Sequence, residues 1–420
     1  MSCGRCKMSA GEMVCTACSC LCDDIEIEIE NGRIVSMEKA CRKGTAFFFG
    51  SENERLRTVH LVDGKQVDTD QALAAAAGLL SRARRPLVFG MDNASLEAQR
   101  QGIELARMLG AVLDDSSSFC QGKLTHDILT GTLPSCTFDQ IHDSDLIIYW
   151  GSNPHNAQPR HLSRFSLYAH RKYHEMGATR YVTMAVVDVR ESETAGAGVA
   201  HRFFRILPGE DSNFIAAIIE GIKGNPVRKD ASGFLKLLKQ SRHCVIFAGL
   251  GLTYSLDNDF SLFYEMLKHL GGWMKTFVIP MSGHYNVRGF NYSLYNATGC
   301  VNKVNFAGGA VSHGDEFSLL EQVKNRAADC LLIVGADPFS SLPISVLKHL
   351  DGVPLITLDP FRTATTEASS VVLGVSLTGL ESGGTAMRMD GTTVTLMPAK
   401  WTDKQSDVQI LERLKELLRP

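Results

Sequence analysis

Short apolar runs that end in glycine, aspartate or proline recur along the chain from residue 70 onward. Helical stretches separate them, as in Gln71–Arg85, where Pro86 follows a basic last turn. Buried parallel strands joined by crossover helices have this pattern, so we expect an α/β protein. The expected strands lie in Pro86–Gly90, Asp145–Pro154, Arg180–Arg190, His243–Gly251, Lys275–Pro280, Asp329–Pro338 and Val353–Pro360.

Two of these regions repeat one another. The segment LIIYWGSNP (146–154) is echoed by LLIVGADP (331–338), and VVDVRESET (186–194) by LITLDPFRTATTEAS (355–369). The repeat predicts two similar α/β units with loops at the carboxyl ends of their strands, where open α/β sheets bind nucleotides. The sequence contains neither GxGxxG nor GxxxxGK[ST], which disfavours an ordinary NAD site or P-loop.

The first 41 residues follow a different pattern. Isoleucines alternate with glutamates over 25–29, Asn31-Gly32 predicts a hairpin turn, and the chain returns through Arg33–Val35. Seven of the 12 cysteines also lie in this region. Cys15, Cys18, Cys22 and Cys41 have the spacing C-x2-C-x3-C-x18-C, which favours a [4Fe–4S] cluster, with zinc or structural thiols as alternatives.

Three further cysteines of this region have other roles in our interpretation. Cys20 lies between expected ligands and is interpreted as a spare thiol. Cys3 and Cys6 form a second C-x2-C pair, which cannot make a site alone and is interpreted as a mobile, reactive tail.

Composition narrows the class of protein. A chain of 420 residues, 44% of them hydrophobic, can form two or three domains with proper cores. The net charge of −3 gives no reason to expect nucleic-acid binding. The first residues lack the apolar stretch of a signal peptide, and no apolar run approaches the roughly 20 residues of a membrane span. We therefore expect a soluble, cytoplasmic protein without a disulfide scaffold.

The cysteine motif, the hairpin, the distant cysteine and the Lys-Gly that follows it resemble the N-terminal domain of the molybdopterin oxidoreductase family. In that family a lysine beyond the fourth cysteine bridges cluster and pterin, and Lys43 matches it, the alternative being a solvated lysine. The resemblance also implies two guanine-dinucleotide loops and a pterin-contacting Gly-Thr loop in LESGGTAMRMDG. Turn or helix-cap chemistry is the alternative for the two dinucleotide loops. The implied residues are Asn153, Pro154 and Asp188 for one dinucleotide, Asp337, Pro338 and Asp359 for the other, and Gly384 and Thr385 for the pterin.

Two more segments fit the same family. In SSSFCQGK, Cys120 matches the loop that ligates molybdenum or tungsten, the alternative being a buried structural thiol. In SGHYNVRGFN, Arg288 could pair with a carboxylate such as formate, and His284 could move protons. Many formate-handling relatives have histidine directly after the metal ligand, whereas this chain has Gln121. That leaves the proton-transfer group open between His284 and His126.

Together these segments are similar to the B subunits of formylmethanofuran dehydrogenases over nearly the whole chain. The resemblance implies a [4Fe–4S] cluster and tungsten or molybdenum bis(molybdopterin guanine dinucleotide), at which CO2 is reduced to formate. It also implies partners: an amidohydrolase-like A subunit that condenses formate with methanofuran, a C subunit, a barrel-forming D subunit and iron–sulfur electron carriers. The C-terminal dinucleotide-binding barrel of most members is expected to be absent here.

The expected fold is an iron–sulfur hairpin domain followed by two doubly wound parallel-sheet domains related by the internal repeat. The expected boundaries are 1–55 for the cluster domain, 56–128 with 275–380 for a discontinuous pterin-binding domain, 129–274 for an inserted Rossmann-like domain, and 381–420 for a cofactor loop and C-terminal helix. Alternatives are a free-standing formate dehydrogenase or nitrate reductase, a redox-inactive scaffold of a bacterial formyltransferase/hydrolase complex, and a zinc-stapled binding module.

Overall fold

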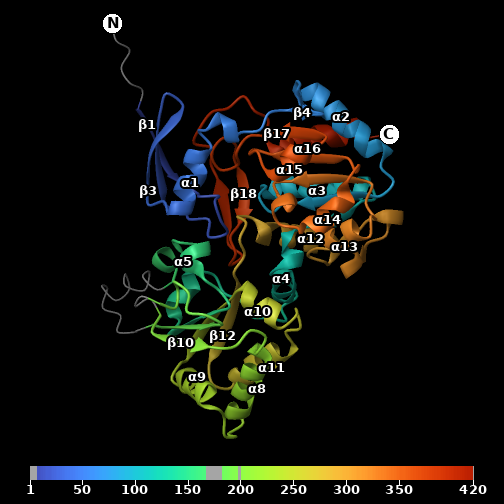
Figure 1. Cartoon of the computed structure of the whole chain (residues 1–420). Helices are drawn as coiled ribbons and strands as arrows, with labels where there is room; N and C mark the ends of the chain where they lie inside the picture. Colours follow the sequence, from blue (N-terminus) through green and yellow to red (C-terminus); the bar gives the residue numbers. More distant parts are fainter. Residues whose placement is uncertain (1–6, 167–181, 197–199, 420) are drawn as a thin grey trace. The chain divides into compact units, whose positions relative to one another are not determined.

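The computed structural model describes residues 7–166, 182–196 and 200–419. Cys3 and Cys6 lie outside these described residues. The chain divides into two compact units (Figure 1). Unit 1 comprises Met1–Gly122, His284–Arg388 and Thr393–Pro420, and unit 2 comprises Lys123–Gly283 and Met389–Thr392.

Unit 1 is built on a nine-stranded sheet with the order β14-β13-β7-β6-β15-β16-β17-β4-β5. Its five central strands, β7 to β17 in that order, are parallel, and the two strands at each edge pair antiparallel. The strands are β4 Leu61–Val62, β5 Lys65–Gln66, β6 Pro86–Gly90, β7 Val112–Asp114, β13 Val304–Asn305, β14 Ser312–His313, β15 Cys330–Val334, β16 Leu355–Asp359 and β17 Val371–Gly374.

Helices cover both faces of this sheet, which is why its central strands read as continuous apolar runs. Alternate strand residues such as Val88 and Leu332 pack against α2, α3, α12 and α16, whereas Leu87 and Leu331 pack against α13 and α14. The helices are α2 Thr69–Arg82, α3 Leu96–Met108, α12 Val287–Thr298, α13 Leu319–Lys324, α14 Ile344–Leu347, α15 Ala364–Ala368 and α16 Asp407–Leu418, with short 3-10 turns at Glu54–Leu56, Ser116–Phe119, Ala307–Gly309, Asp315–Phe317, Pro338–Ser340 and Lys348–Leu350.

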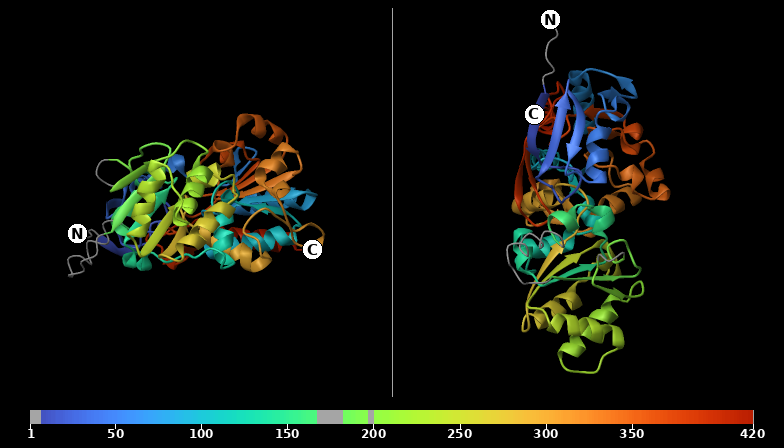
Figure 2. Two further views of the ribbon diagram at one scale, coloured as in Figure 1. Left: turned by 90° about the horizontal axis from the view of Figure 1, so that it is seen from below. Right: turned by 90° about the vertical axis from the view of Figure 1, so that its left-hand side faces the viewer.

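Two smaller sheets complete unit 1. The cysteine-rich segment leads into an antiparallel sheet of β1 (Lys7–Met13), β2 (Ile25–Glu30) and β3 (Arg33–Glu38), followed by α1 (Arg42–Gly50); the right-hand view of Figure 2 shows the three strands side by side. The isoleucines of β2 are buried and its glutamates partly exposed, as the alternation of the sequence requires. The second sheet is a hairpin of β18 (Gly384–Met387) and β19 (Thr393–Leu396).

Unit 2 contains a five-stranded parallel sheet with the order β10-β9-β8-β11-β12. One face packs against α8, α9 and α11, and the aromatic rings of Phe138, His161 and Phe165 cover the other around Tyr149 and Phe247. The elements are α4 Gly122–Leu129, a 3-10 turn at Asp139–Asp143, β8 Leu146–Trp150, α5 Pro154–Ala157, α6 His161–Arg164, β9 Thr183–Asp188, β10 Arg202–Arg205, α8 Asp211–Ile222, α9 Lys229–Lys239, β11 His243–Ala248, α10 Leu250–Ser255, α11 Ser261–Leu270 and β12 Lys275–Pro280.

Two segments belong to a different unit from the one that the expected domain boundaries gave them. The strand β12 pairs with β11 along all six residues, so it belongs to unit 2 and not to the segment 275–380 assigned to the first α/β domain. The segment Met389–Thr392 also belongs to unit 2, where the Asp390 carboxylate accepts a hydrogen bond from the Phe138 N–H at 2.6 Å. Both differences arise from pairings between residues far apart in sequence.

Among the helices of the described residues, we find none with the length and apolar character that crossing a membrane requires.

The turn after β8 should tolerate no side chain at Gly151. This glycine has φ +60°, and a Cβ there would lie 2.3 Å from the backbone nitrogen of Leu252. We expect Gly151→Ala to lower the free energy of unfolding of unit 2 by about 3 kcal/mol or more, the sum of left-handed strain and overpacking. Gly224→Ala is the control, because Gly224 also has a positive φ but has open space around it, and it should cost only about 1–2 kcal/mol. Thermal unfolding checks this; equal losses in the two variants would contradict it.

Candidate functional site

The cysteine loop before β2 is tightly folded and buried. Cys15, Cys18 and Cys22 are almost completely buried. The Cys15 N–H donates to the Cys22 carbonyl at 2.8 Å, and the Leu21 N–H donates to the Cys18 carbonyl at 3.1 Å, with Leu21 in a left-handed turn. These backbone bonds curl the three cysteines into one short loop.

The fourth cysteine joins this loop from the start of α1. The Cys41 sulfur caps the helix by accepting the Gly44 N–H at 3.5 Å. A Cβ at Gly44 would lie 3.0 Å from the Cys15 sulfur and 4.0 Å from that of Cys41, so glycine leaves room for both sulfurs. Burial, and then repulsion from Cys18, Cys22 and Cys41, raises the pKa of Cys15 well above its usual range.

The charge of Lys43 acts on the same cysteines. A hydrogen bond from the Cys20 thiol lowers the pKa of Cys18 to about 7. The positive charge of Lys43 acts in the same direction, whereas burial opposes both. Cys20 is therefore a hydrogen-bonding partner of Cys18. No group of three or more His, Cys, Asp or Glu side chains in the described part of the chain is already arranged to hold a metal ion. The four thiols match a four-thiolate cluster in residue type, and the charges of Cys18, Cys22 and Cys41 act on Cys15.

The two repeated loops adopt the same backbone conformation. Gly151 after β8 and Gly335 after β15 have φ values of 60° and 59°. Asn153 and Asp337 have φ/ψ of −120°/75° and −126°/72°, and each is followed by a buried proline at the first helical position. The sequence similarity between GSNP and GADP therefore extends to the backbone dihedral angles. Both loops lie at the carboxyl ends of parallel strands.

The polar side chains of these loops have partners within their own units. The Asn153 amide donates to Glu193 at 2.7 Å and accepts from the Thr194 hydroxyl at 2.7 Å. Asp337 accepts hydrogen bonds from the N–H and the hydroxyl of Thr365 at 3.0 and 2.6 Å. Pro154 and Pro338 start the short helical turns that follow.

The remaining predicted cofactor residues are also anchored by the protein. The Asp188 carboxylate accepts the Val189 N–H at 2.7 Å. Gly384 has φ +147° and a Cβ there would lie 2.8 Å from the Ser95 Cβ. The N–H and hydroxyl of Thr385 donate to Glu97 at 2.9 and 2.7 Å, so this threonine holds the β18 hairpin against α3.

Cys120 lies in the turn between β7 and α4. It is half-buried, and its thiol donates to the Ser116 carbonyl at 3.4 Å. Burial, and then the carboxyls of Asp115 and Asp92, raise the pKa of Cys120 to about 12. Gly122 closes the turn where a Cβ would lie 2.3 Å from the Asn302 side chain and 2.8 Å from the Ser117 carbonyl. Asn302 and Asn291 each donate to the Ser117 hydroxyl at 2.9 Å, which fixes the turn to α12 and the segment after it.

Gln121, next to Cys120, is 1% exposed, and neither polar atom of its side chain has a hydrogen-bond partner among the described residues. An unsatisfied buried amide costs roughly 1–3 kcal/mol, so this position favours a bound polar group. A large heteroatom-rich cofactor ligated by Cys120 would fit that requirement.

His284 and Arg288 lie in the same unit as Cys120. The His284 side chain is 46% exposed, and its Nδ1 lies 3.1 Å from the Ser116 hydroxyl and 3.5 Å from the Asp92 carboxylate. Arg288 is buried in the first turn of α12. His126, the other candidate for proton transfer, belongs to unit 2, and its Nδ1 lies 3.2 Å from Asp127.

Asp92 and Ser116 contact the candidate residue His284, and neither was predicted from the sequence. Asp92 lies two residues after β6 and is fully buried, and its carboxylate accepts the Ser116 N–H at 3.0 Å. The available signal was an aspartate shortly after an apolar strand, at the edge where open α/β sheets bind ligands.

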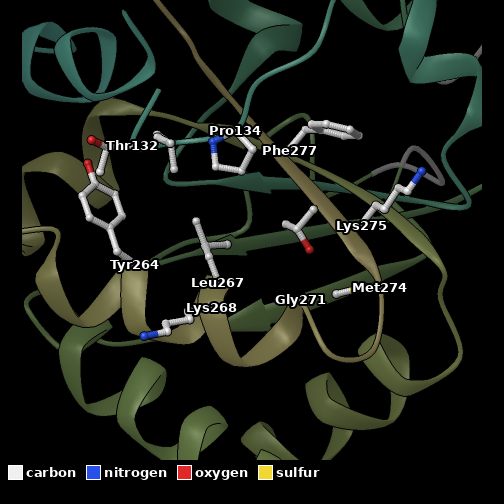
Figure 3. Close-up of a pocket in the computed structure, with 11 residues that line it drawn as sticks. Thr132, Pro134, Tyr264, Leu267, Lys268, Gly271, Met274, Lys275 and Phe277 are labelled. Carbon is white, nitrogen blue, oxygen red and sulfur yellow. The ribbon is translucent and has the colours of Figure 1, made fainter. Parts of the chain in front are cut away.

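Unit 2 also has a cavity of about 720 Å³ at the opposite end of its sheet. The cavity is lined by Tyr264, Leu267 and Lys268 of α11 and by Lys275 and Phe277 of β12, and Figure 3 shows Tyr264 pointing toward Thr132. The repeated loop of Asn153 follows the carboxyl end of β8, and the two strands run parallel on either side of β11. The cavity and that loop are therefore separate features.

Asp359 should make stability depend on pH. Burial, with a smaller contribution from Asp337, raises its pKa to about 7, although the Phe361 N–H donates to it at 2.8 Å. The pKa of Asp359 is higher in the folded state than in the unfolded state, so folding favours the protonated carboxyl. This contribution to stability is fully present below about pH 4 and is lost as pH rises through 7. Asp359→Asn should therefore weaken the fall in unfolding midpoint temperature between pH 5 and 8. An unchanged slope, measured by circular dichroism, would contradict this assignment.

Comparisons with known proteins identify relatives over most of the chain. No family model matches. The chain is 32% identical to the B subunit of tungsten-containing formylmethanofuran dehydrogenase 2 of Methanocaldococcus jannaschii and 30% identical to that of Methanococcus maripaludis, in each case over 91% of this chain and 92% of the relative.

A solved structure has the same fold. A chain in the crystal structure of the formyltransferase/hydrolase complex from Methylorubrum extorquens, determined with methylofuran, matches with a TM-score of 0.67 at 20% identity, covering 86% of this chain and 98% of that one. The identity to the two dehydrogenase B subunits, over most of each chain, establishes the relationship: this chain belongs to the family of formylmethanofuran dehydrogenase B subunits.

Proposed function

We propose that this chain is the catalytic redox subunit of a formylmethanofuran dehydrogenase and that it reduces CO2 to formate. It would do so at tungsten or molybdenum held by a bis(molybdopterin guanine dinucleotide) cofactor, with electrons delivered through a [4Fe–4S] cluster. The observation that carries the proposal is that unit 1 contains two sets of candidate ligands. One is the four thiols of Cys15, Cys18, Cys22 and Cys41, with the charge of Lys43 acting on Cys18. The other is the half-buried Cys120 beside Gln121, whose side-chain amide has no hydrogen-bond partner among the described residues.

Four thiols of the N-terminal loop would hold the cluster. Cys15, Cys18 and Cys22 come from one loop and Cys41 from the start of α1, and they interact electrostatically. Lys43, whose charge acts on Cys18, would lie on the path from the cluster to the pterin. The names of both dehydrogenase relatives include tungsten, which supports a metal centre here.

Cys120 would supply the protein ligand to tungsten or molybdenum, as a soft thiolate suits this metal beside dithiolene sulfurs. Its pKa of about 12 keeps it a neutral thiol until a cation binds, so metal loading would release a proton. The matched backbone of the Asn153 and Asp337 loops would receive the two ends of the cofactor, together with Asp188, Asp359, Gly384 and Thr385 as predicted.

The bound centre would supply two electrons to the carbon of CO2, which with one proton gives formate. The remaining steps belong to side chains of the chain itself. Arg288 would pair with the carboxylate as negative charge develops on it, a contact strengthened by burial. His284 would exchange the proton through Nε2, because its Nδ1 is turned toward Ser116 and Asp92.

Formate would then pass to an amidohydrolase-like A subunit for condensation with methanofuran. A barrel-forming D subunit, a C subunit and iron–sulfur electron carriers would complete the complex. That the solved structure with this fold comes from a complex named for formyl transfer and hydrolysis supports an assembly of this kind.

A redox-inactive scaffold is the second candidate, and the same solved structure favours it, because that complex is named for formyl transfer and hydrolysis alone. A scaffold gives no reason for Lys43 beside the thiol group or for an unsatisfied amide next to Cys120. A formate dehydrogenase-like oxidoreductase that acts without methanofuran is the third candidate; it would share the metal centre.

Metal and sulfide analysis of the complex, purified anaerobically from its native host, tests the proposal. We expect about four iron atoms for this chain beyond those of its partners, and about one tungsten or molybdenum with a guanine-dinucleotide pterin. Cys120→Ala should abolish CO2 reduction without loss of fold. Cys300→Ala, which removes a second half-buried thiol of unit 1, should retain activity.

Zinc in place of iron, or a complex without tungsten and molybdenum, would refute the redox proposal. The scaffold or zinc-module interpretation would then replace it.

A further inference from the structure

The imidazole of His284 is held between two groups that act differently on its tautomer. Its Nδ1 lies 3.1 Å from the Ser116 hydroxyl and 3.5 Å from Oδ2 of Asp92. A hydroxyl can accept a hydrogen bond from Nδ1–H or donate one to an unprotonated Nδ1, so Ser116 permits both neutral tautomers. An ionised carboxylate only accepts, and therefore favours a proton on Nδ1.

We propose that Asp92 is the positioning residue that fixes His284 as the Nδ1–H tautomer, leaving Nε2 of this partly exposed side chain to exchange the proton of the reaction. This inference rests on the proposed function for its role in catalysis, and on the geometry alone for the tautomer. Asp92 is fully buried and acts through His284, so it needs no contact with substrate.

The surroundings of Asp92 leave this carboxylate as the acceptor that faces His284. Burial, followed by repulsion from Asp92 and Asp114, raises the pKa of Asp115 well above its usual range, and the Asp115 carboxyl accepts the Ser117 hydroxyl at 2.7 Å. The Ser116 N–H donates to Asp92 Oδ2 at 3.0 Å, which aims that oxygen at His284. Asp114 has another task, since it accepts the N–H groups of Leu319 and Lys303 at 2.8 and 3.2 Å.

The backbone before Asp92 is constrained as well. Met91 has φ +75°, a left-handed conformation that non-glycine residues adopt only rarely. Gly90 allows this turn because a Cβ there would lie 2.3 Å from the Val334 carbonyl. The Asn286 N–H donates to the Asp92 carbonyl at 3.0 Å, and this bond ties the turn to the segment that carries His284. Asp92 and His284 are therefore held in place from both sides.

The test uses the full-length chain, labelled with 15N at histidine and free of cofactor. Two-bond 1H–15N spectra report which ring nitrogen carries the proton, and the signal of His284 is identified by its loss in His284→Gln. We expect the Nδ1–H form in the wild type and a shift toward the Nε2–H form, which free imidazole side chains prefer, in Asp92→Asn. Asp92→Glu should restore the Nδ1–H form.

Two matched variants separate charge from general disturbance. Ser116→Ala should retain the Nδ1–H form, because the hydroxyl has no tautomer preference. Asp114→Asn removes a neighbouring buried carboxyl that does not contact His284 and should also retain it. An unchanged tautomer in Asp92→Asn, or a shift caused by Ser116→Ala instead, would overturn the proposal.

In the loaded complex, Asp92→Asn should lower kcat by roughly 10–100-fold, the usual cost of losing the partner that orients a functional histidine, with KM for formate unchanged. A raised KM with unchanged kcat would overturn the positioning role. The spectra need no metal, so a complex lacking tungsten and molybdenum would refute the proposed function and leave the tautomer result to decide the assignment of Asp92.

Discussion

The close approach of backbone to backbone at the carboxyl edge of each parallel sheet is the constraint on which the rest of this structure depends. In unit 2, Gly151 after β8 meets Gly249 and Gly251 after β11, with no space for a Cβ on any of the three. In unit 1, Gly90 at the end of β6 meets the Val334 carbonyl, and Gly335 meets Asn93. Because the backbones meet at this edge, the loops that follow can diverge from one another. Open α/β sheets bind ligands in the crevice at their carboxyl edge, where the strand order reverses.

Buried carboxyl groups are the second feature that distinguishes unit 1. Asp92, Asp114, Asp115 and Asp359 all follow or end strands of the nine-stranded sheet and have little or no exposure. Burial of an ionisable group is costly unless the group is neutralised or hydrogen-bonded. Asp114 is hydrogen-bonded by backbone N–H groups and anchors the segment after α12, whereas burial raises the pKa of Asp115 well above its usual range. Asp92 differs from both, because it faces a histidine that is partly open to solvent.

The chemistry next to Cys120 depends on an amide. Gln121 can donate and accept hydrogen bonds but cannot exchange a proton at neutral pH. A proton for the proposed reaction must then come from another element, and His284 at the start of the α12 segment is placed in the same unit with one ring nitrogen already engaged. This arrangement separates the polar contact to a bound group from the proton transfer, two roles that one histidine could combine.

The sequence by itself determined the features that depend on neighbours along the chain. The strand at Pro86–Gly90 has the expected bounds, β2 has the expected alternation, and the GSNP and GADP loops share one conformation, because periodicity, glycine and proline act over a few residues. The roles of the candidate site residues stay predictions.

Tertiary structure alone decided what depends on distant pairing. It placed β12 beside β11, engaged Thr385 with Glu97, and brought Asp92 to His284 across 192 positions. No local pattern encodes such contacts, since they arise only when the free energy of packing whole elements fixes which strand ends meet.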